Sequence, residues 1–138
     1  MVGKRHLDVV CGVIGNEAGQ VLVALRDFES DQGGLWEFPG GKLEFSEVLE
    51  DGLCRELYEE LDIDILEADP WMQVNYEYPL YHVTLHVWRV VRYEGEPKGQ
   101  EGQIIQWVDR NGLKKLKFPP ANGAIVDALL QEELKISS

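Results

Sequence analysis

The sequence predicts an α/β fold, a layered sandwich in which a mixed β-sheet packs with two helices. Segments of continuous or alternating apolar residues, typical of strands, are interspersed with two segments of helical periodicity. The 138 residues suffice for one hydrophobic core but not for two, so we expect a single domain over residues 1–138. Strands and helices joined by short, hairpin-like connections are typical of such a sandwich.

The first half of the chain begins with two predicted strands. Residues 9–14 and residues 21–26 are apolar runs, and a turn containing Gly and Asn separates them at residues 15–19. We therefore expect the two strands to pair as a hairpin. Residues 27–34 predict a polar loop, and residues 35–38 predict a short extended segment.

A helix is predicted from about residue 46 to residue 61. Leu49, Leu53 and Leu57 recur every four residues and form an apolar stripe, and Ser46 has the hydroxyl expected of an N-cap.

The second half predicts two more strands and a closing helix. Residues 81–91 alternate, with Val83, Leu85 and Val87 on one face. Residues 104–108 form a further apolar strand, and residues 124–134 have the spacing of an amphipathic helix.

The charge of the chain limits its partners. The sequence has 13 basic and 25 acidic residues, a formal net charge of −12. Binding along a nucleic acid backbone depends on Lys and Arg, so we expect no long nucleic acid as partner. A small phosphorylated substrate bridged by metal ions remains compatible with this charge.

The sequence also predicts a cytoplasmic protein with no membrane partner. No apolar run approaches the roughly 20 residues needed to cross a bilayer, and the N-terminus lacks the continuous apolar segment of a signal peptide. Cys11 and Cys54 show no metal or disulfide spacing, which favours two free thiols in a reducing compartment.

Three glutamates of the predicted helix indicate its chemistry. Glu56, Glu59 and Glu60 stand at positions i, i+3 and i+4, which places them on one face of a helix. Like charges at this spacing weaken a helix, so the helix itself gains nothing from them. A hard divalent cation such as Mg²⁺ prefers carboxylate oxygens together with substrate phosphates. A solvated acidic face is the ordinary interpretation of such a triplet, and the residues around it favour the metal.

The segment around the triplet resembles the Nudix box, whose pattern is G-x5-E-x7-R-E-U-x-E-E-x-G-U, where U is a bulky aliphatic residue. The matched positions are Gly41, Glu47, Arg55, Glu56, Leu57, Glu59, Glu60 and Ile63. Asp62 replaces the Gly that ends the helix in a left-handed conformation, which Asp tolerates better than most residues. The resemblance extends from about residue 9 to residue 130 and is strongest to the MutT-like branch of the Nudix hydrolases. It implies the Nudix-type α/β/α sandwich with a mixed β-sheet.

The resemblance also implies a metal site and a catalytic group. By position, Glu56, Glu59 and Glu60 would be the helix ligands of Mg²⁺, with Mn²⁺ as a possible substitute. The Gly40 carbonyl and Glu101, from a later loop, would complete the site, although alone Glu101 is an ordinary loop carboxylate. Glu56 is the first choice for the general base. Arg55 and Glu47 resemble a pair that orients the ligands, with a surface salt bridge as the alternative.

The substrate implied by the resemblance is a nucleoside triphosphate, cleaved to the monophosphate and pyrophosphate. We expect a monomer or weak dimer, although the sequence itself does not fix the oligomeric state. The MutT-like branch carries an Asn at the position of Asn122 that contacts an oxidised guanine, so the implied activity is that of an 8-oxo-dGTP diphosphatase that sanitises the nucleotide pool. The alternative is that Asn122-Gly123 is only a turn before the last helix. Arg26 matches a phosphate- or nucleotide-contacting Arg of the family. Phe38 or Tyr78 would stack on the base, with a place in the core as the alternative, since aromatic side chains beside a sheet more often pack there. Tyr81 departs from the branch, where an Arg is usual.

Two other functions stay open at this point. A CTP or modified-pyrimidine triphosphate pyrophosphatase would use the same chemistry on another base. A catalytically inactive nucleotide-binding domain would have lost carboxylates, whereas all of Glu47, Glu56, Glu59, Glu60 and Glu101 are present. Hydrolysis at RNA 5′ ends uses a similar box, but the acidic chain disfavours it.

Overall fold

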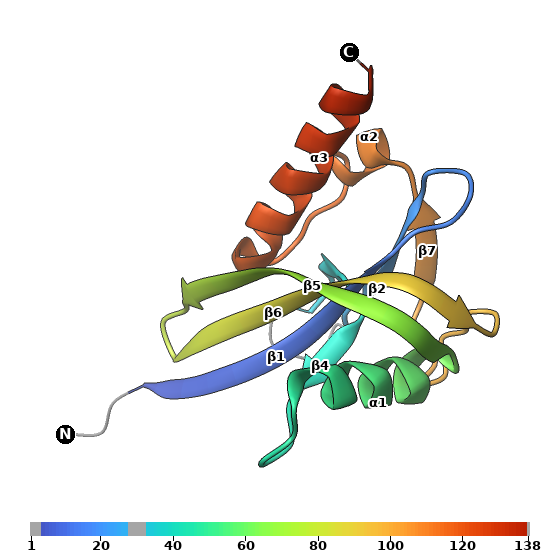
Figure 1. The fold of residues 1–138 in the computed structure, drawn as a ribbon. Helices are drawn as coiled ribbons and strands as arrows, with labels where there is room; N and C mark the ends of the chain where they lie inside the picture. Colours follow the sequence, from blue (N-terminus) through green and yellow to red (C-terminus); the bar gives the residue numbers. More distant parts are fainter. Residues whose placement is uncertain (1–3, 28–32, 138) are drawn as a thin grey trace.

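The structure, a computed structural model, describes residues 4–27 and 33–137, and the side chains up to residue 132. Two β-sheets lie between a helix on one side and a second long helix on the other (Figure 1). The strands are β1 (Arg5–Ile14), β2 (Val21–Leu25), β3 (Trp36–Glu37), β4 (Gly40–Lys42), β5 (Asp64–Glu77), β6 (Tyr81–Glu94) and β7 (Ile105–Val108). The helices are α1 (Leu49–Leu61), the short α2 (Arg110–Leu113) and α3 (Gly123–Ser137), with a single 3₁₀ turn, η1, at Pro120–Asn122.

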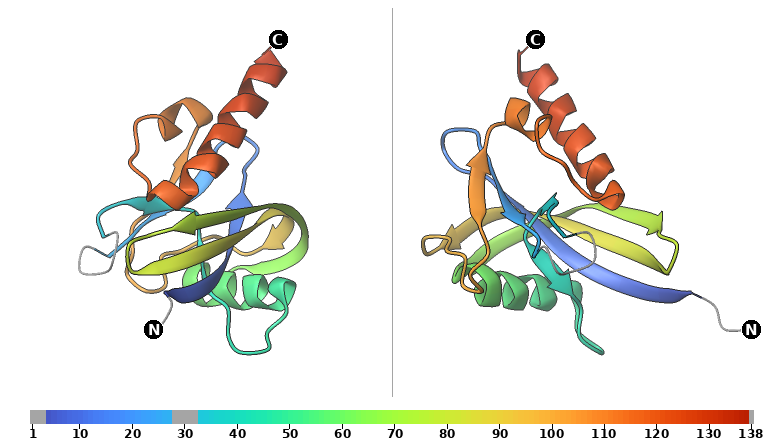
Figure 2. Two further views of the ribbon diagram at one scale, coloured as in Figure 1. Left: turned by 90° about the vertical axis from the view of Figure 1, so that its left-hand side faces the viewer. Right: turned by 180° about the vertical axis from the view of Figure 1, so that it is seen from behind.

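The larger sheet is mixed, as the sequence predicts. Its strand order is β4-β1-β6-β5, in which β1 and β6 run parallel and the other neighbours antiparallel. The smaller sheet is antiparallel and has the order β3-β2-β7. Helix α1 covers one side of this arrangement and α3 the other, as the views of Figure 2 show. The predicted α/β/α sandwich is confirmed.

Strand β1 supplies apolar side chains to both faces of the large sheet. Val10 and Ile14 belong to one core cluster, together with Leu53, Leu57 and Leu61 of α1. Leu49 of the predicted stripe is only half-buried and is not part of this cluster, and Leu61 takes its place. The alternate residues of β1, among them Cys11 and Val13, belong to a second cluster with Ile125 and Leu129 of α3. Because successive side chains of a strand point to opposite faces, this doubly apolar strand is stable only in the middle of a sandwich.

The hairpin expected from residues 9–14 and 21–26 is wrong. The two strands meet only at an isolated bridge between Gly15 and Val21, and they belong to different sheets. Strand β4 occupies one edge of β1 and β6 occupies the other. Strand β2 pairs instead with β3 and β7, in the smaller sheet.

The predicted N-cap of the first helix is also wrong, whereas its C-terminal end is confirmed. The helix begins at Leu49 after Val48, and Ser46 lies before it with φ of 62°. The Glu47 side chain organises this entry instead, because its Oε1 accepts the backbone N–H of Glu44 at 3.0 Å. Asp62 takes the left-handed conformation, φ 59° and ψ 39°, and donates its N–H to the Tyr58 carbonyl.

Strands β4 and β5 and helix α2 are absent from the sequence-based expectations. Strand β5 lacks a regular alternation, contains Pro70, and pairs with β6 through three register shifts. Helix α2 is only four residues long and begins at the capping side chain of Asp109. The loop expected at residues 27–34 lies mostly outside the described residues. Within the described chain, no helix combines the length and apolar character needed to span a membrane.

Candidate active site

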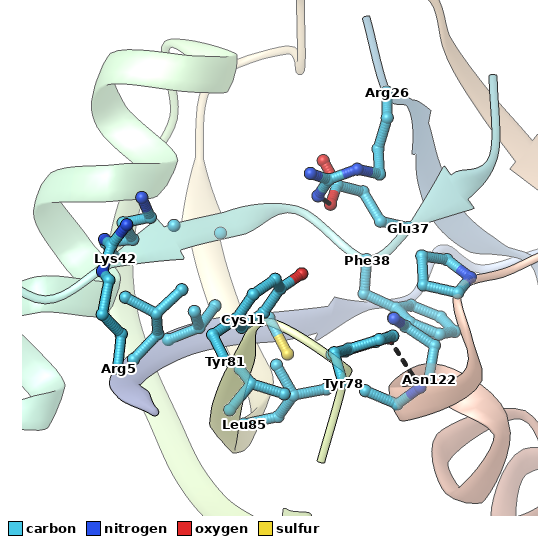
Figure 3. A pocket seen from close by; sticks show the side chains of 17 residues that line it. Arg5, Cys11, Arg26, Glu37, Phe38, Lys42, Tyr78, Tyr81, Leu85 and Asn122 are labelled. Carbon is cyan, nitrogen blue, oxygen red and sulfur yellow. Dashed lines mark hydrogen bonds and ion pairs between the residues drawn. The ribbon is translucent and has the colours of Figure 1, made fainter. Parts of the chain in front are cut away.

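A cavity of about 400 Å³ opens between the large sheet, strands β3 and β4, and the η1 turn (Figure 3). Its floor is apolar and comes from β1 and β6, with Leu7, Val9, Cys11, Val83 and Leu85 among the lining residues. Asn122, Phe38 and Tyr78 lie together at one end, and Arg5 and Lys42 lie together at the other. The cavity therefore has a predominantly aromatic end with one amide and a cationic end beside the Gly40-Gly41 backbone.

Two of the predicted metal ligands stand beside the Gly-Gly segment. Glu60 is 7% exposed, and its Oε2 accepts the Gly40 N–H at 3.2 Å. Burial and the neighbouring charges of Glu37 and Glu56 raise the pKa of Glu60 to about 8. Any side chain at Gly41 would collide with Glu56, since a Cβ there would lie 2.3 Å from Glu56 Oε2. Gly41 therefore allows Glu56 of α1 to lie against β4, whereas Gly40 allows β4 to lie close to β1, because a Cβ at Gly40 would lie 2.0 Å from the Val10 carbonyl oxygen.

Glu56 is less buried than Glu60 and is held by an arginine. Its side chain is 17% exposed, and its Oε1 accepts Arg55 Nη1 at 2.9 Å. Burial raises the pKa of Glu56, the Arg55 contact opposes that rise, and the charges of Glu59 and Glu101 add to it.

The two remaining carboxylates of the predicted set lie at the solvent side. Glu59 is 55% exposed and reaches Arg55 Nη1 at 3.2 Å. Glu101 lies in an exposed loop whose Gln100 N–H and Gln103 amide both donate to the Glu60 carbonyl, at 3.1 and 3.2 Å. These bonds keep the Glu101 loop at the end of α1, close enough for its charge to raise the pKa values of Glu56 and Glu60.

Arg55 connects most of this cluster. Its Nε and Nη2 donate to the two oxygens of Glu47 at 2.7 and 2.9 Å, a bidentate pair. Its Nη2 also donates to the Lys42 carbonyl at 3.2 Å, which ties α1 to β4. The hydrogen bonds from Arg55 and the Glu44 amide lower the pKa of Glu47 to about 2, and the Glu47 and Glu56 carboxylates raise the pKa of Arg55. Arg55 is thus the counter-charge that keeps several glutamates together.

The cluster fits a divalent metal by its chemistry. The donors are carboxylate oxygens, which hard cations prefer, and burial, together with the charges of neighbouring carboxylates, raises the pKa of Glu56 and Glu60. Across the described residues, no three His, Cys, Asp or Glu side chains are already converged on one point. Arg55 and the Gly40 amide occupy carboxylate oxygens instead, so the site is a set of neighbouring donors.

The other end of the cavity has one buried polar side chain. Asn122 is 8% exposed, and its side-chain amide makes no hydrogen bond to any other residue in the described part of the chain. Phe38 is 2% exposed and stacks on Phe118, with ring centroids 5.5 Å apart. Tyr78 is 7% exposed, and its hydroxyl accepts the Ala121 N–H at 3.1 Å.

Sequence reasoning missed several lining residues, of which Glu37 is the most unusual. It pairs with Arg26, whose Nη1 donates to Glu37 Oε2 at 2.6 Å, and both residues line the cavity. Burial raises the pKa of Glu37, and the Arg26 contact opposes this. The signal in the sequence was a charged residue within an otherwise apolar segment, directly before Phe38. Arg5, Lys42 and Cys11 were missed as well. They line the cavity because of how their strands pair in the sheet, and no local pattern in the sequence indicates this.

Comparisons with known proteins agree with this geometry. Residues 10–128 match the model of the NUDIX domain family. An 8-oxo-dGTP diphosphatase of Escherichia coli (strain K12) is 38% identical, over 91% of this chain and 97% of that protein. A CTP pyrophosphohydrolase of the same organism is 32% identical, over 91% of this chain and 93% of that protein. Among solved structures, a MutT protein from a study of Aliivibrio salmonicida and Vibrio cholerae superposes with a TM-score of 0.77 at 30% identity, covering 91% of this chain and 96% of the other.

Proposed function

The chain belongs to the Nudix hydrolase family, and we propose that it hydrolyses 8-oxo-dGTP to 8-oxo-dGMP and pyrophosphate in an Mg²⁺-dependent reaction. The observation that carries the proposal is the cavity itself, with the Asn122 side chain, which has no hydrogen-bond partner among the described residues, at one end and the carboxylate-flanked Gly40-Gly41 segment at the other. A nucleotide has the same polarity, with a hydrogen-bonding base at one end and phosphates at the other.

The metal would be held by the helix carboxylates. The family uses divalent metal ions, and we assign Mg²⁺, with Mn²⁺ as a substitute, to Glu56, Glu59 and Glu60. The Gly40 carbonyl and Glu101 complete the proposed set. When bound, such an ion neutralises phosphoryl oxygens and lowers the pKa of the attacking water.

The residues of the chain then have separate roles in the reaction. Glu56 accepts a proton from the water that attacks the β-phosphorus, and the bond from this phosphorus to the α-phosphate oxygen breaks. The products are the nucleoside monophosphate and pyrophosphate. Arg55 and Glu47 are positioning residues. Their bidentate pair fixes the orientation of the Arg55 guanidinium, whose Nη1 donates to Glu56.

Base selection is assigned to the buried end of the cavity. The Asn122 amide can donate and accept hydrogen bonds at once, as the edge of an oxidised purine requires. Phe38 and Tyr78 supply the apolar surroundings that make such bonds selective, and Arg26 contacts the nucleotide from the adjoining wall.

Replacing Asn122 with Ala should lower kcat/KM for 8-oxo-dGTP more than for dGTP. The expected loss is about 1–3 kcal/mol, the usual cost when a buried polar group of the substrate has no partner. The ratio of kcat/KM for the two nucleotides is the measurement. An equal loss on both nucleotides would make Asn122 a structural turn residue.

Replacing Arg55 with Lys should raise the Mg²⁺ concentration needed for half-maximal activity by about tenfold. An ammonium group cannot form the bidentate pair with Glu47 and reach Glu56 at the same time, and supporting contacts of this kind are worth about 10–100-fold in metal affinity. Arg92→Lys is the matched control. Arg92 is 65% exposed, and its ion pair with Glu67 is weak because the two groups lie 4.0 Å apart. An unchanged Mg²⁺ dependence in Arg55→Lys would show that the cluster needs only a positive charge.

A pyrimidine triphosphate is the second candidate substrate. Tyr81 lines the cavity where MutT-like chains usually carry Arg, and a CTP pyrophosphohydrolase is among the relatives. Hydrolysis of 8-oxo-dGTP, dGTP, CTP and dCTP with Mg²⁺, with pyrophosphate identified as product, tests both. A higher kcat/KM for CTP or dCTP than for 8-oxo-dGTP would overturn the first assignment.

The proposed place of action is the cytoplasm, because both Cys11 and Cys54 are free thiols and the proposed substrate belongs to the nucleotide pool. The single domain over residues 1–138 and the monomer or weak dimer stay predictions.

A further inference from the structure

The Tyr78 hydroxyl connects two parts of the cavity wall that are far apart in the sequence. Tyr78 lies in the turn between β5 and β6, at the edge of the large sheet, and Ala121 lies in the η1 turn before α3. The Ala121 N–H donates to Tyr78 Oη at 3.1 Å, a buried hydrogen bond between residues 43 positions apart, drawn as a dashed line in Figure 3. Asn122 is the next residue of the same turn.

The tyrosine side of this bond is held firmly. The backbone N–H of Tyr78 donates to the Tyr81 carbonyl at 2.8 Å, and its own carbonyl accepts Lys4 Nζ at 3.0 Å. Its ring packs against the rings of Tyr76 and Tyr81, with centroids 4.8 and 5.1 Å away. The hydroxyl is therefore a fixed point relative to the sheet that forms the cavity floor.

The residues just before the η1 turn connect it to the β3 side of the cavity. Phe118 stacks on Phe38, the Trp36 N–H donates to the Lys117 carbonyl at 2.8 Å, and the Asn122 N–H closes the turn on Pro119 at 2.9 Å. These contacts fix the shape of the turn and its place beside β3. The bond to Tyr78 fixes its distance from the cavity floor.

We propose that the Tyr78 hydroxyl is a positioning group that sets where the Asn122 amide stands in the cavity, and that it thereby determines the base specificity of the enzyme. The inference rests on the proposed function and on the role of Asn122 in it. An amide distinguishes two purines only when its donor and acceptor are aligned with the base edge, since hydrogen bonds weaken steeply with misalignment. Without the hydroxyl, the Ala121 N–H is buried without this partner, and the distance of the turn from the cavity floor is no longer fixed by it.

Tyr78→Phe tests the proposal because it removes the hydroxyl and keeps the ring that packs in the wall. The ratio of kcat/KM for 8-oxo-dGTP to kcat/KM for dGTP should fall by about three- to tenfold, the usual range for one neutral hydrogen bond. In an Asn122→Ala background, adding Tyr78→Phe should leave the ratio unchanged, because the Asn122 amide that contacts the base is already absent. Tyr76→Phe is the matched control: its hydroxyl makes no hydrogen bond among the described residues, so the ratio should stay as in the parent enzyme.

Amide hydrogen exchange separates this inference from the proposed function. The Ala121 amide should exchange at least about threefold faster in Tyr78→Phe and at the parent rate in Tyr76→Phe. An unchanged exchange rate, or a fall in the ratio that is as large in the Asn122→Ala background, would overturn the inference. A parent enzyme that does not prefer 8-oxo-dGTP would overturn the proposed function, and the exchange experiment would still decide whether the hydroxyl holds the turn.

Discussion

Glu60→Gln should lower Mg²⁺-dependent turnover by at least about a hundredfold while making the metal-free protein more stable. Loss of a group that merely supports a metal ligand costs about 10–100-fold, and a direct ligand should cost no less. The stability should rise because Glu60 is 7% exposed and lies near the charges of Glu37 and Glu56. A Gln oxygen still accepts the Gly40 N–H, so the contact between α1 and β4 is kept.

The measurements are kcat at saturating Mg²⁺ and the thermal midpoint in the presence of a chelator. A rise of about 2–6 °C is expected, corresponding to roughly 1 kcal/mol for a domain of this size. Glu50→Gln is the control, because Glu50 lies on the exposed side of the same helix, and neither quantity should change much. Full turnover in Glu60→Gln would remove Glu60 from the metal site. A lower midpoint would mean that its charge stabilises the fold.

The sequence predicts the face of α1 on which the carboxylates lie but not the difference between them. The spacing of Glu56, Glu59 and Glu60 follows from helix geometry alone. In the structure Glu59 is 55% exposed whereas Glu60 is buried, and this difference arises from β4 and from the Glu101 loop that packs on the end of α1. We therefore expect Glu59→Gln to cost less activity than Glu60→Gln.

For the strands, the sequence likewise predicts their positions along the chain but not how they pair. Residues 9–14 and 21–26 are identified as strands from their apolar pattern. Their pairing is not, because β1 pairs with β4 and β6, which come later in the sequence. Strand β5 has no alternation to reveal it, because its register shifts against β6 change which residues face inward.

The end of the cavity assigned to the base is the part of the site that the sequence alone predicts least. Asn122, Phe38 and Tyr78 can be assigned to it only through the resemblance to the family, and the structure brings all three to one end of the cavity. The hydrogen bond between Tyr78 and Ala121 spans 43 residues, and no local pattern in the sequence predicts it.

Glu56→Gln should lower kcat by about 10²–10⁴-fold, the usual range for loss of a general base, even when Mg²⁺ is saturating. The amide oxygen still accepts Arg55 Nη1, so the geometry around Arg55 is kept, but an amide cannot take the proton of the attacking water. Saturating Mg²⁺ separates the two roles assigned to Glu56, because excess metal compensates for a weakened ligand and cannot replace a base. Glu44→Gln is the matched control, since Glu44 also lies near Arg55, at 3.6 Å, but is 67% exposed. If Glu56→Gln recovers more than about a tenth of the parent kcat at high Mg²⁺, Glu56 acts only as a ligand and another group accepts the proton.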